Sequence, residues 1–348
     1  MGKIFTALGL MSGTSGDGVD ASIISSDGIT QYKEILNKYF EYDQKIYEKL
    51  HNIKGKITKQ EDLKKNRDEI NHLEKEITLF HAKVVNKVLE LINKKIDFIG
   101  FHGQTIYHSP IEKISKQIGD GNLLSQLTKK IVIYDFRQND IKNGGEGAPL
   151  VPIFHRKIVE QKKIQLPVCI LNIGGVTNVT VIKNLNNEGF LSKDLGPGNC
   201  LIDEWIRKNT KNKFDINGEI AKKGKTNDLI LNQALDNFYN KTNQISSSFD
   251  IKDFSLGFVR GLSLEDGAAT LTEFTGRIIE AGLLSYYLDS KNKILRVVIC
   301  GGGRKNLTLI ESIKSRIHKD LIIQPIDDYG IDGDYVESQA FAFIAIRS

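Results

Sequence analysis

Short apolar segments joined by glycine-rich turns occur in both halves of this chain. Residues 4–11 and 19–26 flank the sequence Ser-Gly-Thr-Ser-Gly-Asp-Gly, and residues 168–173 and 177–182 flank Gly174-Gly175. Two apolar runs joined by such a turn predict a β-hairpin at each place. We therefore expect two related domains, 1–164 and 165–348, with the boundary near the Lys- and Gln-rich residues 157–166.

The other periodicities predict an α/β fold. Apolar residues recur at steps of three, four and seven along residues 61–92, the period of one face of a long helix. Short apolar runs followed by polar residues or glycines are typical strands of α/β proteins, and they occur at 96–101, 131–136 and 297–300. Helices are expected over 200–208, 306–317 and 335–346. The sequence leaves open on which domain the last helix packs.

The composition is that of an ordinary globular protein. With 348 residues, 26% charged and 40% apolar, it suits about two domains and excludes a disordered or collagen-like chain. The net charge of +5 is spread along the chain, so we expect no nucleic-acid partner. No apolar stretch approaches the ~18 residues of a membrane span. Three widely spaced cysteines, Cys169, Cys200 and Cys300, favour a reducing, cytoplasmic compartment.

The first glycine turn has the chemistry of a phosphate site. Residues 13–20 combine glycines that let backbone N–H groups approach an anion, hydroxyls that donate, and two carboxylates, Asp17 and Asp20, that suit a hydrated Mg²⁺. The alternative is a polar hairpin turn in which Asp17-Gly18 supplies the turn geometry. The segment is neither a Walker P-loop nor a dinucleotide-binding G-x-G-x-x-G.

Asp194 precedes a Gly-Pro-Gly turn that fixes its backbone. A carboxylate held in this way suits a general base. It could instead cap the turn or the helix expected over 200–208. Both interpretations remain open on these residues alone.

Arg137 follows the strand expected at 131–136. It could bind a substrate carboxylate or phosphate, or pair with Asp135 or Asp140 as a structural clamp. His102 and His108 have no third ligand at metal-binding spacing. A hydrogen-bonding loop is therefore expected at 102–105, where the preceding strand ends.

The order of these motifs carries more information than any one of them. Along the chain they are Gly9-Leu10-Met11-Ser12-Gly13-Thr14-Ser15, Asp17-Gly18-Val19-Asp20, His102-Gly103-Gln104-Thr105, Asp135-Phe136-Arg137, Gly147-Ala148-Pro149-Leu150-Val151-Pro152, Leu171-Asn172-Ile173-Gly174-Gly175, Gly196-Pro197-Gly198-Asn199 and Cys300-Gly301-Gly302-Gly303. With them the chain resembles the anhydro-N-acetylmuramic acid kinase family, from residue 9 to about 343.

The resemblance implies a two-domain actin-like ATPase (ribonuclease H-like) fold, with duplicated mixed sheets and a central cleft that holds nucleotide and sugar. It implies that ATP and Mg²⁺ are used to open 1,6-anhydro-N-acetylmuramic acid, a small sugar from cell-wall turnover, and to phosphorylate its O6. The family also implies a homodimer. The resemblance adds to the composition argument that neither nucleic acid nor membrane is a partner.

The resemblance also implies roles for single residues. Asp194 matches the catalytic aspartate and Glu337 a carboxylate beside the sugar. Arg137, His102, Gln104 and Thr105 are candidates for substrate contact. The residues expected to bind ATP are Gly13, Thr14, Ser15, Gly16, Asp17, Gly18, Val19 and Asp20 in the first phosphate turn, Gly174, Gly175 and Asn178 in the second, and Gly301, Gly302 and Gly303 against the adenosine, with Asp17 holding Mg²⁺ through water.

The chain departs from the family pattern at four places. Gly16 replaces the usual Leu, Glu146 replaces the usual Gln, residues 246–254 lack the family's Lys-Ser-Thr-Gly-Arg-Glu segment, and the usual tail containing Val-Thr-Gly is missing after Ser348. We expect Gly16 to make the first turn more flexible. These departures bear on the affinity for the substrate and on its identity. Two alternatives stay open: a kinase for another sugar, and a non-catalytic nucleotide or sugar sensor, since one fold can host both.

Overall fold

The computed structural model describes residues 2–109, 111–186, 189–242, 248–289 and 293–348. Contacts between Cα atoms divide the chain into a first unit, Met1–Lys157 with Tyr335–Ser348, and a second unit, Ile158–Asp334. The division therefore falls at 157/158 rather than 164/165, and the last helix belongs to the first unit. Among the described residues, no helix is both long enough and apolar enough to cross a lipid bilayer.

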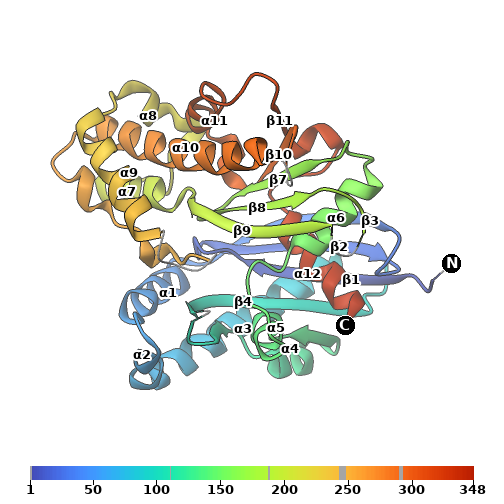
Figure 1. The fold of residues 1–348 in the computed structure, drawn as a ribbon. Helices are drawn as coiled ribbons and strands as arrows, with labels where there is room; N and C mark the ends of the chain where they lie inside the picture. The colour runs from blue at the N-terminus through green and yellow to red at the C-terminus, as the bar shows by residue number, and fades with distance from the viewer. Residues whose placement is uncertain (1, 110, 187–188, 243–247, 290–292) are drawn as a thin grey trace. The chain divides into compact units, whose positions relative to one another are not determined.

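The first unit is built on a six-stranded mixed sheet (Figure 1). Its strand order is β3-β2-β1-β4, and both β5 and β6 pair with β4. The β1–β2 and β2–β3 pairs are antiparallel, whereas β1–β4 and β4–β6 are parallel. The strands are β1 (Phe5–Ser12), β2 (Gly18–Ser26), β3 (Tyr32–Glu41), β4 (Phe98–Ser109), β5 (Ile114–Ile118) and β6 (Ile131–Tyr134).

The second unit repeats this sheet. Its order, β9-β8-β7-β10-β11, matches β3-β2-β1-β4-β6 strand for strand, and each pair has the same relative direction. The strands are β7 (Val168–Ile173), β8 (Val176–Ile182), β9 (Phe190–Pro197), β10 (Arg296–Cys300) and β11 (Ile322–Pro325). The predicted α/β fold with duplicated mixed sheets, and both predicted hairpins, are confirmed.

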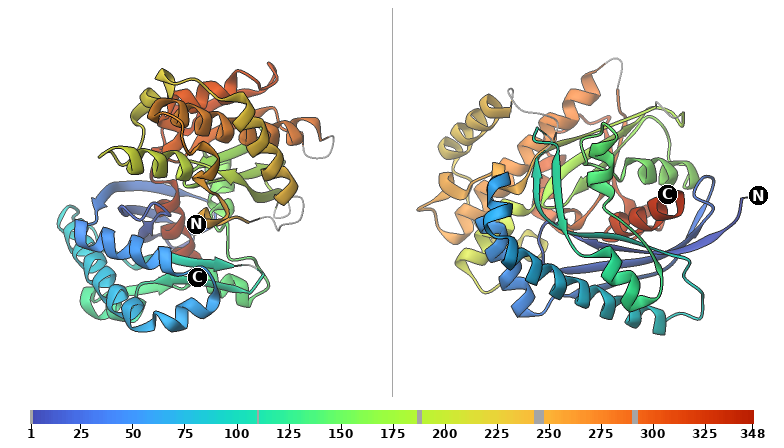
Figure 2. Two further views of the ribbon diagram at one scale, coloured as in Figure 1. Left: turned by 90° about the vertical axis from the view of Figure 1, so that its left-hand side faces the viewer. Right: turned by 90° about the horizontal axis from the view of Figure 1, so that it is seen from below.

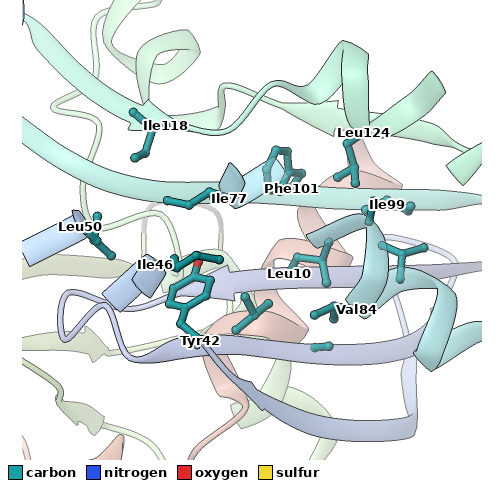
Figure 3. Close-up of a cluster of buried hydrophobic side chains, with 14 of the residues drawn as sticks. Leu10, Tyr42, Ile46, Leu50, Ile77, Val84, Ile99, Phe101, Ile118 and Leu124 are labelled. Atoms are coloured by element: carbon teal, nitrogen blue, oxygen red, sulfur yellow. The ribbon is translucent and has the colours of Figure 1, made fainter. Parts of the chain in front are cut away.

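Helices cover the sheet of the first unit. Side chains of α1 and α3 pack on β1, β2 and β4 in one buried cluster, in which Leu10, Leu50, Ile77 and Phe101 lie together (Figure 3). Figure 2 shows α1 and α3 along this face of the sheet. The helices are α1 (Gln44–Lys56), α2 (Gln60–Lys65), α3 (Arg67–Glu90), α4 (Gly121–Thr128), α5 (Phe136–Lys142), α6 (Pro152–Gln161), which runs across the unit boundary, and α12 (Val336–Arg347).

Helix α12 packs on the sheet of the first unit through two glycines. Leu8 and Leu10 belong to the cluster with α1 and α3, so Gly9 between them faces the opposite side of β1. A Cβ atom at Gly9 would lie 1.9 Å from the Ser338 carbonyl oxygen, and one at Gly100 would lie 2.2 Å from that of Phe341. The helix backbone therefore lies directly against β1 and β4.

Buried side chains among the described residues of the second unit form the following clusters. One joins its sheet to α10 and α11, and another joins α7, α8, α9 and α10. The helices are α7 (Cys200–Asn209), α8 (Glu219–Lys223), α9 (Asp228–Thr242), α10 (Leu264–Leu288) and α11 (Leu307–Lys314), with short 3₁₀ turns η1 (Ile216–Gly218), η2 (Ile251–Asp253), η3 (Leu256–Val259), η4 (Gly302–Lys305) and η5 (Ile326–Tyr329). Cys169 and Cys300 are buried and Cys200 is half-buried; burial raises the pKa of Cys200 to about 12, so this thiol stays protonated.

Several predicted elements differ from the structure; the strand expected at 131–136 ends at Tyr134, because Asp135 has a φ of +60° and Phe136 begins α5. The single helix expected over 61–92 is divided at Asn66, whose side-chain amide donates to the Asp62 carbonyl oxygen at 2.8 Å and competes with the helical backbone. The strand expected to end at Phe101 continues to Ser109, because its second half pairs with β5. The expectation of a loop at 102–105 was therefore wrong.

Candidate active site

The two glycine turns occupy equivalent places in the two sheets. One connects β1 to β2 and the other connects β7 to β8. A Cβ atom at Gly13 would meet nothing closer than 3.8 Å, and one at Gly174 nothing closer than 3.5 Å. The space beside these turns is thus open, in contrast to Gly9, where α12 fills it. Open backbone of this kind fits the close approach of a phosphate group.

The carbonyl oxygens of the first turn accept hydrogen bonds from two side chains and one backbone N–H. The Gly13 oxygen accepts from the Gln104 side-chain amide at 2.9 Å and from the Gly16 N–H at 3.1 Å. The Thr14 oxygen accepts from Lys54 Nζ at 2.6 Å. Because carbonyl oxygens repel anions, engaging them within the protein favours an anion next to this turn.

In the second turn, the carbonyl oxygens accept hydrogen bonds from backbone N–H groups of residues 198–200. The Gly174 oxygen accepts from the Asn199 N–H at 2.8 Å, and the Gly175 oxygen accepts from the N–H of Gly198 at 2.9 Å and of Cys200 at 3.2 Å. A Cβ atom at Gly198 would lie 2.3 Å from the Gly174 oxygen. The Gly-Pro-Gly segment therefore supports the second turn directly.

Asp17 is the carboxylate of the first turn. Ser15 Oγ donates to Asp17 Oδ1 at 2.6 Å. Gly18, Val19 and Asp20 already belong to β2, and the Val19 side chain is buried in the cluster with α1 and α3. No group of three His, Cys, Asp or Glu side chains suited to a metal occurs among the described residues. One carboxylate nevertheless fits Mg²⁺, which keeps several waters and is shared with substrate phosphates.

Gly16 is fixed rather than loose. Its φ is +65°, and a Cβ atom there would lie 2.8 Å from Leu50 Cδ2 on α1. Glycine adopts this backbone conformation without the cost that other residues pay. The expectation that Gly16 loosens the turn therefore finds no support, because the residue lets the turn lie against α1.

Asp194 lies on β9 opposite Asn178 of β8. Its Oδ2 accepts from the Phe249 N–H at 2.8 Å and from Ser248 Oγ at 3.4 Å. Helix α7 begins after Asn199, whose own side chain forms no cap hydrogen bond. Of the departing segment 246–254, residues 246 and 247 lie outside the described residues; Ser248 and Phe249 contact the candidate base.

The Gly301–Gly303 segment follows β10 and is held by a buried arginine. Arg304, with 7% of its side chain exposed, donates Nε and Nη2 to Asp327 at 2.7 and 3.0 Å, and it also pairs with Asp332 at 3.2 Å and with Asp334. Its Nη1 donates to the Gly301 carbonyl oxygen at 3.1 Å.

The charges of this cluster support one another. The hydrogen bond from Arg304 lowers the pKa of Asp327. Burial raises the pKa of Asp334, but hydrogen bonds from Lys305 and Arg304 offset this and leave the pKa lowered. The carboxylates thus stay ionised around the arginine.

Arg137 lies in α5 and acts as a clamp in this structure. Its Nε donates to His102 Nε2 at 2.7 Å and its Nη1 to the Gly147 carbonyl oxygen at 3.0 Å. Burial, followed by the nearby Arg137 charge, holds the pKa of His102 well below its usual value, so the imidazole is neutral. The clamp uses His102 and Gly147, whereas Asp140 accepts from the Gly147 N–H at 2.8 Å.

The remaining candidates lie on β4 and α12 of the first unit. Gln104 supports the first turn, and Thr105 Oγ1 accepts from the Gln117 side-chain amide at 3.1 Å. Glu337 is half-buried in the first turn of α12, where a helix N-terminus favours a carboxylate.

The chain matches known proteins over its whole length. A sequence model described as "Anhydro-N-acetylmuramic acid kinase" matches residues 5–348. The chain belongs to the anhydro-N-acetylmuramic acid kinase family. A relative of that name from Pelagibacter ubique is 56% identical, covering 100% of this chain and 93% of the relative.

More distant relatives carry the same name. A member of the anhydro-N-acetylmuramic acid kinase family from Zymomonas mobilis is 38% identical, with 98% of this chain and 92% of the relative covered.

Among solved structures, the chain is similar to the activator of the 2-hydroxyisocaproyl-CoA dehydratase from Clostridium difficile, at 12% identity and a TM-score of 0.46, covering 99% and 95% of the two chains.

Three features of this family member were not found from the sequence. They are the Lys54 contact with the first turn, the Phe249 contact with Asp194, and the Arg304 cluster. Only the last left a signal, since Arg304 follows the glycine run directly and acidic residues recur at 327, 328, 332 and 334. The other two depend on contacts between segments distant in sequence.

Proposed function

We propose that this chain is a kinase that uses ATP to convert 1,6-anhydro-N-acetylmuramic acid into N-acetylmuramic acid 6-phosphate, in the recycling of cell-wall peptidoglycan. The observation that carries the proposal is the family match over residues 5–348. The β1–β2 turn of the first unit and the equivalent β7–β8 turn of the second unit are both rich in glycine and open on one side. In both turns the carbonyl oxygens accept hydrogen bonds from the protein, which supports phosphate binding.

Asp194 would act as the general base. It takes a proton from a water molecule whose oxygen forms a bond to the anomeric carbon C1. The bond from C1 to O6 breaks, and O6 forms a bond to the γ-phosphorus. The bond from the γ-phosphorus to the β–γ bridging oxygen breaks, and ADP leaves with its electron pair. Because phosphoryl transfer has a loose transition state, most of the remaining catalysis is positioning and charge neutralisation.

The two turns would bind the phosphates through their backbone N–H groups. Asp17 would hold Mg²⁺ through water, and this ion would neutralise charge on the phosphates. Gly301–Gly303, fixed by Arg304, would lie against the adenosine. Glu337 would contact the sugar. Arg137, held by His102, is a weaker candidate for that role.

Labelled water tests the reaction directly. The protein is incubated with ATP, Mg²⁺ and 1,6-anhydro-N-acetylmuramic acid in ¹⁸O-water, and the product is analysed by mass spectrometry and NMR. We expect one ¹⁸O at C1 and the phosphate on O6. An unlabelled product would contradict hydrolytic opening.

Two alternatives give different results in the same experiment. A kinase for another sugar would phosphorylate that sugar without taking up ¹⁸O, and a sensor would bind ATP or sugar without turnover. Asp194→Asn should lower kcat at least ~10²-fold while ATP still binds, the usual effect of removing a positioned base. Unchanged turnover would remove Asp194 from this role.

The proposal includes a cytoplasmic, homodimeric enzyme. All three cysteines are present as thiols in the structure, which supports a reducing compartment. The dimer is carried over from the family resemblance and is tested by light scattering.

A further inference from the structure

Ser248 and Phe249 contact the candidate base from outside its own sheet. Asp194 Oδ2 accepts a hydrogen bond from the Phe249 N–H at 2.8 Å and another from Ser248 Oγ at 3.4 Å. Ser248 is 6% exposed. A carboxylate oxygen held by a backbone amide has a defined lone-pair direction, so the plane of the Asp194 carboxylate depends on where this segment lies.

The Phe249 ring anchors the segment. It lies 6.1 Å from the ring of Phe238 on α9 and 5.6 Å from that of Phe254, and the Phe238 ring lies 6.0 Å from that of Phe274 on α10. We call these four residues the phenylalanine cluster. Aromatic pairs at such separations add to the burial energy of the rings. The backbone amide of Phe249 is therefore placed by packing.

The same cluster also contacts the strand that carries Asp194. A Cβ atom at Gly196, two residues after Asp194 on β9, would lie 3.0 Å from Phe238 Cζ. Phe238 thus lies against the β9 backbone near the acceptor and against the side-chain ring of Phe249, whose N–H is the donor. The Phe238 ring therefore links the packing of Phe249 to the strand that carries Asp194.

We propose that Phe249 is a positioning residue for the reaction: its ring docks in the phenylalanine cluster, and its N–H orients Asp194 toward the water that attacks C1. This inference rests on the proposed role of Asp194 as the base. Holding one carboxylate oxygen sets the direction of the other. The effect falls on the chemical step, because neither glycine turn contacts Phe249 through a hydrogen bond that the structure describes.

Substitutions at Phe249 separate positioning from bulk packing. Phe249→Ala removes the anchor, and we expect kcat to fall about tenfold or more, since small misplacements of catalytic groups have effects of this order. The KM for ATP should stay within about twofold of the wild-type value, because the turns are intact. Phe249→Leu keeps an apolar anchor and should restore most of kcat.

Phe258→Ala is the matched control. Phe258 packs on Phe274 with ring centres 5.0 Å apart, and it belongs to the buried cluster that joins α7, α8, α9 and α10. It forms no described ring contact with Phe249. This variant should lose comparable stability, measured by urea unfolding, but keep kcat. Ser248→Ala supplies a milder test should Phe249→Ala not fold: kcat should fall about threefold with an unchanged KM for ATP.

The outcomes are distinct. Equal kcat losses in Phe249→Ala and Phe258→Ala, or no rescue by Phe249→Leu, would overturn the positioning role. Full kcat in both Phe249→Ala and Ser248→Ala would also overturn it. If Asp194→Asn itself keeps turnover, the proposed function of Asp194 fails instead, and that result is independent of the Phe249 variants.

Discussion

The side-chain amide of Gln104 donates to the carbonyl oxygen of Gly13 at 2.9 Å, across 91 residues of sequence. The contact exists because β4 continues past Phe101 and places Gln104 opposite Ser12, the last residue of β1. Gln104 is fully buried. A residue expected to touch substrate therefore supports the turn expected to bind ATP.

Gln104→Leu should weaken ATP binding. The variant keeps the size of the side chain but removes the hydrogen bond to Gly13, a change worth about 1–2 kcal/mol. We expect the KM for ATP to rise roughly tenfold with little change in the KM for the sugar. Gln117→Leu is the control, since Gln117 lies on β5 and donates to Thr105 and Ser115. A selective rise in the KM for the sugar would instead assign Gln104 to the substrate.

Gly9→Ala should destabilise the first unit strongly. The new methyl group would lie 1.9 Å from the Ser338 carbonyl oxygen, so α12 must move away from β1. We expect a loss of about 3 kcal/mol or more in the free energy of unfolding, measured in urea. Gly55→Ala on α1 is the control: nothing lies within 4 Å of its Cβ position, and the gain in helix propensity should stabilise by about 0.5–1 kcal/mol. Equal effects would refute the packing argument.

The hairpins were predictable because their signal is local. A turn such as 174–175 and its flanking apolar strands lie within fifteen residues. Strand β3 gave no such signal, because its outer residues are exposed and its pairing with β2 makes it a strand. The extension of β4 likewise depends on β5.

In the candidate site, too, the residues in local motifs could be predicted and the long-range contacts could not. The glycine turns and Asp194 were found from short motifs. The contact of Phe249 with Asp194 spans 55 residues, and that of Lys54 with Thr14 spans 40. Neither follows from composition or periodicity, since a hydrogen bond to a backbone group needs no particular residue type at the other end.

Arg304→Lys should disturb the Gly301–Gly303 segment. Lysine keeps the charge but cannot form the bidentate pair with Asp327 or reach Gly301 at the same time. We expect a loss of about 2–3 kcal/mol in unfolding free energy, at the low end for a buried ion pair because the carboxylates are partly exposed. The KM for ATP should also rise.

The control for Arg304 is a second arginine, Arg277, whose described ion pair is with the single carboxylate of Glu273. Arg277→Lys keeps its contact with Glu273 within α10, far from the glycine run in sequence. It should change stability by less than about 0.5 kcal/mol and leave the KM for ATP unchanged. If Arg304→Lys behaves like Arg277→Lys, the cluster does not hold the segment.

Acid should unfold this protein through its buried histidines. Burial lowers the pKa of His155 to about 3 and that of His81 to about 4. Their stabilising contribution is complete above the unfolded-state pKa of about 6.5 and declines as the pH falls, because the unfolded chain then binds more protons. Each of these two histidines should therefore lower the free energy of unfolding by about 2 kcal/mol at pH 5 relative to pH 7.5.

His155→Gln tests this directly, since it removes the titrating group but keeps a polar side chain. The loss of unfolding free energy between pH 7.5 and pH 5, measured in urea, should be smaller than in the wild type by about 2 kcal/mol. His72→Gln is the matched control, because the His72 side chain is 71% exposed and its replacement removes no buried imidazole. Identical pH dependence in His155→Gln and the wild type would show that His155 takes up a proton without unfolding the chain, which its 2% exposure argues against.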